Sequence, residues 1–189
     1  MMAAETPHKQ LHMVWPEWLL AWPPEPAVPP GYELRVHAEA DEGAYLALMS
    51  AAGFDGWTHE RLAELRPSVL PEGHFVVVHE ATGELAATAM ARHRPSELHP
   101  DGGELAWVAG RPAHRGKGLG IAVCAAVTER FLRAGYRRIY LQTDDFRLAA
   151  LKTYLKLGYE PFLYCGGMAE RWERVFRELG WKGQRDEDE

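Results

Sequence analysis

The spacing of apolar residues along the chain predicts strands and helices over most of its length. Runs that are apolar, or that alternate between apolar and polar residues, predict strands at 32–37, 74–78, 84–91, 104–110, 139–142 and 159–164. Apolar residues that recur every third or fourth position predict helices at 42–52, 58–65, 117–134, 148–157 and 170–179. Ala81-Thr82-Gly83 joins two of these strands, 74–78 and 84–91, and predicts an antiparallel hairpin.

Residues 1–31 are rich in proline and contain Trp15, Trp18 and Trp22. Proline fixes φ and lacks an N–H group, so this density predicts an extended arm rather than a long helix. We expect these large side chains to be covered, with the arm packed against the domain or against a second subunit. A proline-rich peptide ligand is the alternative. The chain is therefore divided into an arm at 1–31, a central domain at 32–165, and a C-terminal helix with an acidic tail at 166–189.

The composition limits the class of protein. The 189 residues are 47% hydrophobic and 25% charged, with a formal net charge of -6, which is typical of one soluble globular domain. An acidic chain without a basic stripe predicts no binding to nucleic acid. No apolar run approaches the roughly 18 residues that cross a bilayer, which predicts no membrane span. With no secretory signal at the N-terminus, we expect a cytoplasmic protein.

Neither the cysteines nor the histidines form a metal-binding pattern. Cys124 falls in the middle of a predicted helix, where it is expected to be a small core residue, and Cys165 has no zinc-ligand spacing beside it. His93 and His99 lie in a polar stretch between two predicted strands, and we expect both to be exposed to solvent. The sequence therefore predicts no metal site.

The stretch Arg115-Gly116-Lys117-Gly118-Leu119-Gly120 joins a predicted strand directly to a predicted helix. Glycine lacks a Cβ atom, so the backbone can turn sharply and a ligand can approach the main-chain N–H groups. At the start of a helix these N–H groups have no intrahelical partners, and the peptide dipoles add partial positive charge. Three glycines at a helix start would weaken the helix unless something required a bare backbone. This stretch is typical of a phosphate-binding loop.

The spacing of the glycines excludes two common phosphate loops. A P-loop would need glycine at Arg111 and serine or threonine at Gly118, and a dinucleotide fingerprint would need glycine at Ile121. What remains, Arg-Gly-x-Gly-Leu-Gly between a strand and a helix, resembles the pyrophosphate-binding motif of the GNAT superfamily of N-acetyltransferases. Residues 150–159, with Ala150, Tyr154 and Gly158-Tyr159, resemble the second signature of the same family.

The resemblance covers the C-terminal half strongly and residues 32–164 in the order of their elements. It implies an α+β fold, with a GNAT-like mixed, mostly antiparallel central sheet and helices on both faces. The family would place a further strand near the C-terminus, where this sequence predicts a helix at 170–179. That strand could come from the N-terminal arm, come from a partner chain in a homodimer, or be absent.

The resemblance also implies a cofactor, acetyl-CoA or another acyl-CoA. Its pyrophosphate would bind the N–H groups of Arg115, Gly116, Lys117, Gly118, Leu119 and Gly120. Its pantetheine arm would run along Val108, Ala109 and Gly110, in the manner of an added strand. Arg147 shares a helical face with Tyr154 and could also point toward the cofactor, although the family usually has asparagine at this position.

Attack of an amine on a thioester requires a base for the amine and an acid for the departing thiolate. Tyr154 matches the family's proton donor, and a phenol with a pKa near 10 is protonated at neutral pH, as an acid must be. For the base, the family often places a carboxylate on the strand that Glu104 begins. Glu80, Glu84 and His74 are alternatives, and many relatives use no dedicated base.

Several functions fit this sequence. The first is transfer of an acyl group to the amine of a small molecule, and its variant is acetylation of a protein or peptide amine. The second is a non-catalytic module that binds acyl-CoA and signals to a partner through the tryptophan arm. Phe54 and Trp57 follow the first predicted helix, where the resemblance implies that they border an acceptor pocket; as aromatic residues beside a helix they are also typical of plain core.

Overall fold

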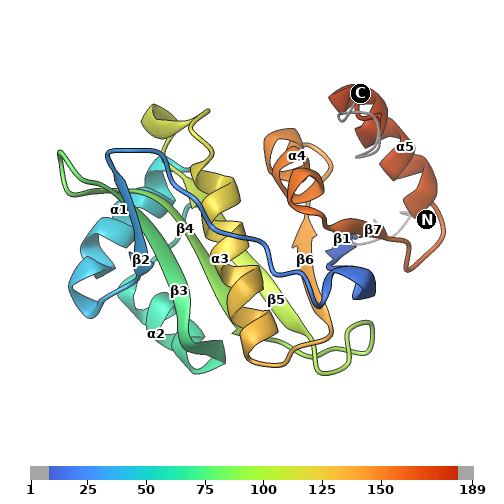
Figure 1. Cartoon of the computed structure of the whole chain (residues 1–189), viewed down its shortest axis with the longest axis horizontal. Helices are drawn as coiled ribbons and strands as arrows, with labels where there is room; N and C mark the ends of the chain where they lie inside the picture. Colours follow the sequence, from blue (N-terminus) through green and yellow to red (C-terminus); the bar gives the residue numbers. More distant parts are fainter. Residues whose placement is uncertain (1–8, 183–189) are drawn as a thin grey trace, which may run out of the picture.

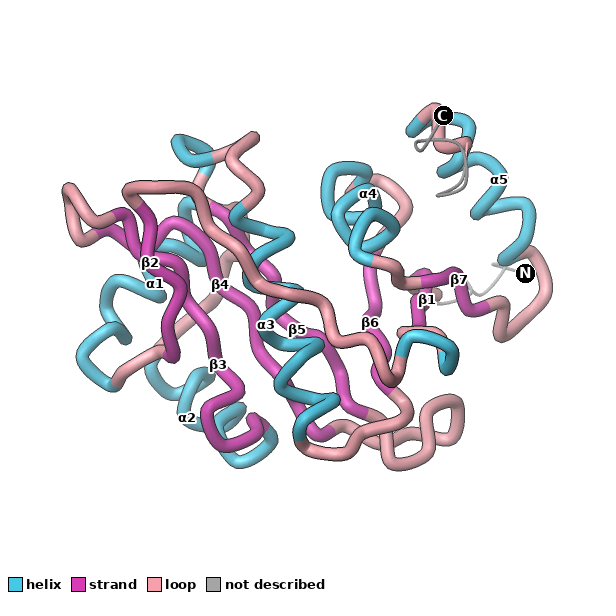
Figure 2. Tube along the Cα trace, viewed as in Figure 1, coloured by secondary structure: helices cyan, strands magenta, loops and turns pink. Residues whose placement is uncertain are grey.

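The computed structural model describes residues 9–182, which form one seven-stranded sheet with helices on both faces (Figures 1 and 2). The order of strands across the sheet is β2-β3-β4-β5-β6-β1-β7. The strands are β1 (Leu11–Val14), β2 (Tyr32–Val36), β3 (Val69–His79), β4 (Glu84–His93), β5 (Gly103–Gly110), β6 (Ile139–Thr143) and β7 (Glu160–Phe162). All neighbouring pairs are antiparallel except β5 and β6, so the predicted α+β class and mostly antiparallel sheet are confirmed.

The helices divide between the two faces of the sheet. They are α1 (Glu42–Ala51), α2 (His59–Leu65), α3 (Leu119–Arg133), α4 (Leu148–Leu157) and α5 (Met168–Leu179). One core cluster forms where Val123, Val127 and Phe131 of α3 pack on the central strands, and all three side chains are fully buried, as their spacing predicts. A second cluster forms around Tyr45 and Leu48 of α1 on the opposite face.

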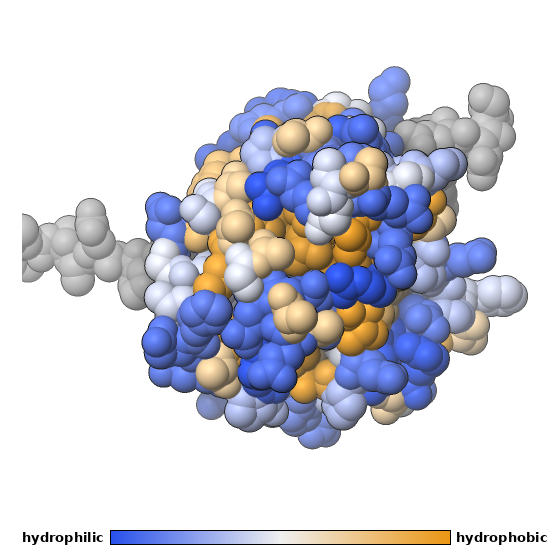
Figure 3. All heavy atoms as spheres, turned by 90° about the vertical axis from the view of Figure 1, so that its left-hand side faces the viewer, coloured by the Kyte–Doolittle hydropathy of each residue, from blue (hydrophilic) through white to orange (hydrophobic). Residues whose placement is uncertain are grey.

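The edge strand β2 belongs to the side of the molecule that faces the viewer in Figure 3. Hydrophobic residues gather toward the middle of that face and hydrophilic residues surround them. Val36, at the end of β2, is 40% exposed. Strands β3 and β4 follow β2 in the order of the sheet. They form the predicted hairpin and pair with each other from Val69 to His79.

The N-terminal arm supplies the strand that the C-terminal part of the sequence lacks. Strand β1 lies between β6 and β7 and is antiparallel to both, with Leu11 opposite Thr143 and His12 opposite Phe162. Leu11 and Met13 are fully buried. Of the three sources that the sequence allowed, the same chain's N-terminal arm is therefore the one observed, and the sheet gives no reason to invoke a homodimer.

The tryptophans of the arm have different environments. Trp15 is 4% exposed, and its ring meets Tyr159 edge-on at a centroid distance of 5.2 Å. Its backbone N–H continues the sheet by donating to Ile139 O at 2.9 Å. Trp18 and Trp22 are 62% and 71% exposed, so the expectation that all three are covered is wrong for these two within the described chain. Both tryptophans come after Trp15, whose N–H makes the last hydrogen bond of the arm to β6, and nothing in residues 9–182 encloses them.

Strands β5 and β6 pair only at their first residues. Gly103 lies opposite Ile139 and Glu104 opposite Tyr140, and no further pair joins the two strands. Beyond Glu104 the strands therefore separate, and each leaves part of its backbone without a neighbour on that side. A separation inside a sheet opens space for a ligand while the outer strands remain fixed by their other neighbours. This position is where the candidate site lies.

Candidate functional site

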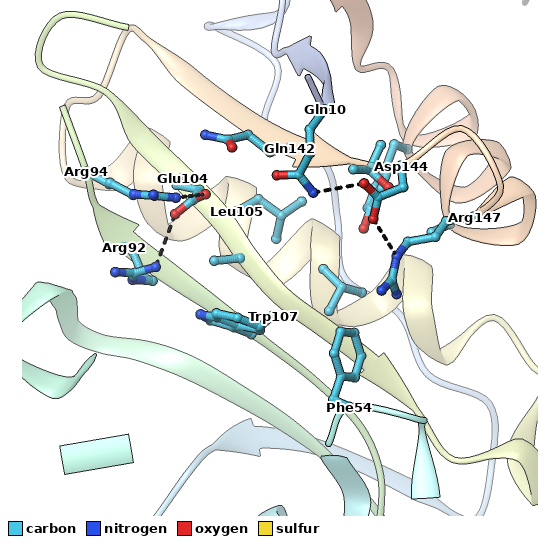
Figure 4. A pocket seen from close by; sticks show the side chains of 15 residues that line it. Gln10, Phe54, Arg92, Arg94, Glu104, Leu105, Trp107, Gln142, Asp144 and Arg147 are labelled. Atoms are coloured by element: carbon cyan, nitrogen blue, oxygen red, sulfur yellow. Dashed lines mark hydrogen bonds and ion pairs between the residues drawn. The ribbon is translucent and has the colours of Figure 1, made fainter. Parts of the chain in front are cut away.

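A cavity of about 220 Å³ lies where β5 and β6 separate (Figure 4). Strand β5 forms its floor with Leu105, Ala106, Trp107 and Val108, and the other walls come from distant parts of the chain. The remaining lining residues are Gln10, Phe54, Arg92, Arg94, Glu104, Gln142, Thr143, Asp144, Arg147, Ala150 and Tyr154. Of the residues predicted from the sequence, Glu104, Val108, Arg147 and Tyr154 meet at this cavity. Phe54 lines it as well, as the resemblance implied.

Glu104 is held by two arginines. Its carboxylate accepts hydrogen bonds from Arg94 Nη1 at 2.8 Å and from Arg92 Nη1 at 3.3 Å. Arg92 is the cross-strand partner of Glu104 on β4, so the register of β4 with β5 creates this ion pair. Glu104 is only 5% exposed, whereas a strand start is ordinarily solvated. The neighbouring strands cover it, and the two guanidinium groups compensate its buried charge.

Tyr154 lines the cavity from α4 and is 6% exposed. Burial raises the pKa of its hydroxyl far above its usual value, because removal of water disfavours the phenolate; the nearby Arg147 charge acts weakly in the opposite direction. Tyr154 is therefore protonated throughout the neutral range. A buried phenol with a raised pKa can donate a proton to a stronger base, but it does not lose one to water.

Strand β5 is irregular at Trp107. The register with β4 shifts between Thr88 and Met90, and Trp107 has a φ of 54°, in the left-handed region that L residues rarely adopt. An extra residue on one strand of an antiparallel pair is a β-bulge, and bulges are common beside ligand sites because they redirect backbone groups. The bulge lies in the floor of the cavity. The spacing of residues in the sequence did not predict the bulge, because a tryptophan within an apolar run is typical of a regular strand.

The side chain of Trp107 extends from this bulge into an aromatic group. Its ring meets Trp57 edge-on at a centroid distance of 4.8 Å and Phe54 at 6.2 Å. The guanidinium of Arg61 lies 4.8 Å from the Trp57 ring centroid and 5.0 Å from that of Trp107. Trp57 thus supports the cavity floor but does not line it, and Phe54 is the residue of the predicted pair that reaches the cavity.

Arg147 precedes α4 and closes one end of the cavity. Its Nε donates to Asp144 Oδ2 at 3.2 Å, and its guanidinium lies 5.0 Å from the ring centroid of Phe54 and 5.5 Å from that of Phe146. Arg147 is also the N-cap of α4, with a backbone outside the helical region and no side-chain cap.

The glycine loop leads into α3 as predicted. Gly116 and Gly118 have φ values of 78° and 76°, a conformation for which glycine is the least strained residue. A Cβ atom at either position would meet no atom within 4 Å, so the protein leaves the space beside this backbone open. Gly118 is the N-cap of α3, and no side chain caps the helix. Lys117 lies near Tyr32, with Nζ 5.6 Å from the ring centroid.

The other predicted cofactor residues lie on the same side of the site. Ala109 is buried opposite Thr88, and Gly110 pairs with Ala87 at the end of β5. Gly110 is thus the last strand residue before the chain turns through a short 3-10 helix, Pro112–His114, into the glycine loop. Leu119 and Gly120 are the first two residues of α3. A ligand that spans from the loop to the cavity would therefore follow Gly110, Ala109 and Val108.

The alternative bases lie away from the cavity. Glu84 begins β4 and pairs with Arg111 and His114. Glu80 follows the end of β3, where its backbone N–H bonds to Gly31 O, and it does not line the cavity. Burial lowers the pKa of His74 to about 3, and its Nε2 lies 3.0 Å from Thr88 Oγ1. His74 stacks on His37 outside the cavity lining.

His99 corrects another expectation. Its ring is fully buried, stacked on Tyr140 at a centroid distance of 3.8 Å and bonded to His12. The expectation of exposure is wrong for His99 because the loop after β4 folds back over the start of β6, whereas His93 is exposed. Within residues 9–182, no group of three histidine, cysteine or acidic side chains is arranged to hold a metal.

Sequence reasoning missed six polar residues of the cavity: Gln10, Arg92, Arg94, Gln142, Thr143 and Asp144. The register of β4 with β5 could have found Arg92, since it pairs Arg92 with Glu104. No sequence signal places Gln10 there, because it lies in the arm. In the described part of the chain, none of the helices is both long and apolar enough to cross a membrane. The acidic tail, residues 186–189, lies outside the described residues.

Comparison with known proteins agrees with this geometry. The sequence matches the model of the Acetyltransferase (GNAT) family over residues 14–159. A mycothiol acetyltransferase of Nocardia farcinica is 30% identical over 146 residues, which are 73% of this chain and 48% of that protein. A mycothiol acetyltransferase of Thermobispora bispora is 32% identical over 146 residues, covering 72% and 49%. The chain thus spans about half the length of the curated relatives it matches.

Solved structures agree with the fold. The crystal structure of a GCN5-related N-acetyltransferase from Sphaerobacter thermophilus superposes with a TM-score of 0.65 at 25% sequence identity. The superposition covers 83% of this chain and 50% of that chain. The region shared with the family includes strands β2 to β6, the glycine loop and Tyr154, and it contains every residue that lines the cavity except Gln10.

Proposed function

This chain belongs to the GNAT acetyltransferase family, and we propose that it transfers the acyl group of an acyl-CoA, most simply acetyl-CoA, to an amine of a small molecule. The observation that carries the proposal is the cavity between the separated strands β5 and β6, which Tyr154 and Glu104 both line. The cavity is small, about 220 Å³, and this favours a small acceptor over a folded protein. The names of the mycothiol acetyltransferase relatives support the same class of acceptor.

The glycine loop fits the phosphate end of the cofactor. Gly116 and Gly118 leave the space beside the helix start open, and the N–H groups of the first turn of α3 lack side-chain caps. Arg115 and Lys117 add positive charge beside it. A pyrophosphate could therefore accept hydrogen bonds from this backbone. From there, Gly110, Ala109 and Val108 offer the edge of β5 that β6 does not occupy beyond Glu104.

Acetyl-CoA supplies an acetyl group activated as a thioester, and the residues of the chain provide proton transfer and orientation. The amine nitrogen forms a bond to the acetyl carbon, and the carbon–sulfur bond breaks. Tyr154 gives its hydroxyl proton to the departing thiolate, for which its raised pKa makes it a weak but correctly protonated acid. The proton lost by the amine passes to Glu104, directly or through water, or to solvent. Both carboxylate oxygens of Glu104 already accept a hydrogen bond from an arginine, and this favours the water-mediated route.

Calorimetric titration of acetyl-CoA and CoA tests the proposal. We expect wild-type protein to bind both with micromolar Kd, and a Gly118→Glu variant to lose binding because a carboxylate would occupy the pyrophosphate position. Gly83→Glu is the matched control, since Gly83 has a similar φ of 70° and equally open surroundings but lies in the β3–β4 turn. A panel of small amines is then assayed for release of free CoA above hydrolysis. No binding by the wild type would refute the cofactor assignment, and binding without transfer to any amine would favour the acyl-CoA-binding module.

A further inference from the structure

One residue that lines the cavity lies outside the region matched by the family. Gln10 lines the cavity although the family match begins at residue 14. Its Nε2 donates a hydrogen bond to Asp144 Oδ1 at 3.2 Å, in the loop between β6 and α4. In Figure 4 the amide oxygen of Gln10 points away from Asp144, toward the side of Gln142. A residue of the N-terminal arm thus presents a polar group to the cavity.

Arg171 of α5 connects the same loop to the start of the arm. Its guanidinium forms a bidentate ion pair with Asp145, in which Nε lies 2.9 Å from Oδ2. Its Nη1 donates to Lys9 O at 2.6 Å. Arg171 lies beyond the end of the family match at residue 159, so the C-terminal helix and the N-terminal arm meet at this loop. Bidentate arginine–carboxylate pairs fix orientation as well as distance, because both partners are planar.

Tyr164 completes the connection. Its hydroxyl donates to Gln10 O at 2.7 Å, and its ring lies 4.4 Å from that of His12 between centroids. Gln10, Tyr164 and Arg171 are here called the terminal clasp. The terminal clasp contacts the loop 144–147 through Asp144 and Asp145, and it contacts the chain at the start of β1 through Lys9 and His12. The same loop carries Arg147, which closes the end of the cavity above Phe54.

We propose that the terminal clasp is the positioning device of the acceptor site: Arg171 fixes the loop 144–147, and Gln10 hydrogen-bonds a hydroxyl or amide group of the acceptor beside its amine. This inference rests on the proposed function for the identity of the acceptor, but the clasp itself is a property of the fold. One N–H of the Gln10 amide is used by Asp144, and its carbonyl oxygen is the group that faces the cavity. The acceptor class is thus a polar amine with a hydrogen-bond donor near the reacting nitrogen.

The first test needs no activity. Amide hydrogen exchange is measured on wild-type protein, Arg171→Met and Arg174→Met. Both arginines are on α5, but Arg174 is exposed and serves as the matched control. We expect residues 144–147 to exchange at least tenfold faster in Arg171→Met and at the wild-type rate in Arg174→Met. Unchanged exchange in Arg171→Met would overturn the clasp, and equal acceleration in both variants would show a general effect of the helix instead.

The second test uses the acetylation assay with 2-aminoethanol and propylamine, which match in size and differ in the hydroxyl. We expect Gln10→Leu to lower the ratio of kcat/KM for the two amines at least fivefold, with acetyl-CoA affinity unchanged within twofold. Arg171→Met should raise the KM of the amino alcohol more than it lowers kcat. An unchanged ratio in an active Gln10→Leu variant would overturn the acceptor contact. If the wild type acetylates no amine, the proposed function fails, whereas the exchange measurement still decides the clasp.

Discussion

Arg138 donates a hydrogen bond from Nε to Nδ1 of His99 at 3.0 Å, and this contact decides which nitrogen of His99 carries the proton. Because Nδ1 accepts, the neutral ring is protonated at Nε2, which lies 2.8 Å from Nδ1 of His12. His99 therefore donates to His12, and His12 carries its own proton on Nε2. This chain of contacts fastens β1 to the loop after β4, so a strand from the arm is held by groups 87 residues away along the chain.

The His12–His99 pair predicts a loss of stability in mild acid. Burial, followed by the charges of nearby arginines, lowers the pKa of each ring to about 4, below its value of about 6.5 in the unfolded chain. Between these values the unfolded chain binds more protons, so stability is complete above about pH 7 and falls as the pH drops from 6.5 toward 4. Between pH 7 and 5.5, urea denaturation should show a loss of up to about 1 kcal/mol for each histidine.

A variant separates this pair from other acid effects. His99→Gln should reduce the pH dependence between 7 and 5.5, although it lowers stability at pH 7. His93→Gln, on the exposed end of β4, should keep the wild-type dependence. An unchanged slope in His99→Gln would show that other groups cause the loss.

Tyr154→Phe is expected to reduce kcat at least tenfold with little change in acetyl-CoA affinity, because it removes the proposed acid and leaves the ring. Tyr159→Phe is the matched control. Tyr159 is as deeply buried, and its hydroxyl lies 2.8 Å from Thr128 Oγ1 rather than at the cavity. Tyr159→Phe should cost about 1 kcal/mol of stability and leave kcat near wild type. Equal activity of the two variants would remove Tyr154 from the chemistry.

Glu104→Gln should destabilise the fold by about 3 kcal/mol, because it leaves the half-buried Arg92 without its counter-charge. Arg94→Gln removes the other partner of Glu104, but Arg94 is 50% exposed and should cost less than about 1 kcal/mol. Urea denaturation of both variants tests whether Glu104→Gln loses more unfolding free energy than Arg94→Gln. If Glu104 also accepts the proton of the amine, Glu104→Gln lowers kcat, whereas Arg94→Gln keeps a kcat near that of the wild type. Full activity in a folded Glu104→Gln variant would exclude the proton-acceptor role.

Gly103→Ala is expected to cost about 2 kcal/mol of stability. An added Cβ would lie 2.4 Å from Phe131 Cε1 and 2.9 Å from Tyr136 Cδ1, and Phe131 is fully buried and cannot move away. Gly43→Ala is the opposite case, since Gly43 is in α1 with no atom within 4 Å, and alanine should add up to about 1 kcal/mol. Thermal denaturation that fails to separate these two variants would contradict the packing described here.

The bulge at Trp107 predicts an unusual order of substitutions. Trp107→Asn should be more stable than Trp107→Val by about 1 kcal/mol, because asparagine tolerates positive φ and a β-branched residue does not. Valine is the more hydrophobic of the two, so burial alone would give the reverse order. At Trp57, whose φ is not positive, we expect that reverse order. Urea denaturation of the four variants decides, and the same order at both positions would exclude backbone strain as the cause.

Local spacing was enough for much of the fold. The hairpin of β3 and β4, the buried face of α3 and the glycine loop all depend on residues within about twenty positions of one another, and periodicity and turn chemistry report such contacts. The departure at the C-terminus was also visible, since a helix stands where the family would place a strand. The sequence alone thus led to the α+β class and to a family whose signatures are local.

Contacts between distant residues were decided by tertiary structure. The insertion of β1 between β6 and β7 joins the two ends of the chain, and no local pattern marks Leu11–Val14 as an inner strand. The burial of Glu104 and His99 depends on which strands and loops cover them. Only the same arrangement brings Gln10 to the cavity and Arg171 to Asp145. Sequence periodicity encodes which face of an element is apolar, whereas the partner that covers it depends on the packing of the whole chain.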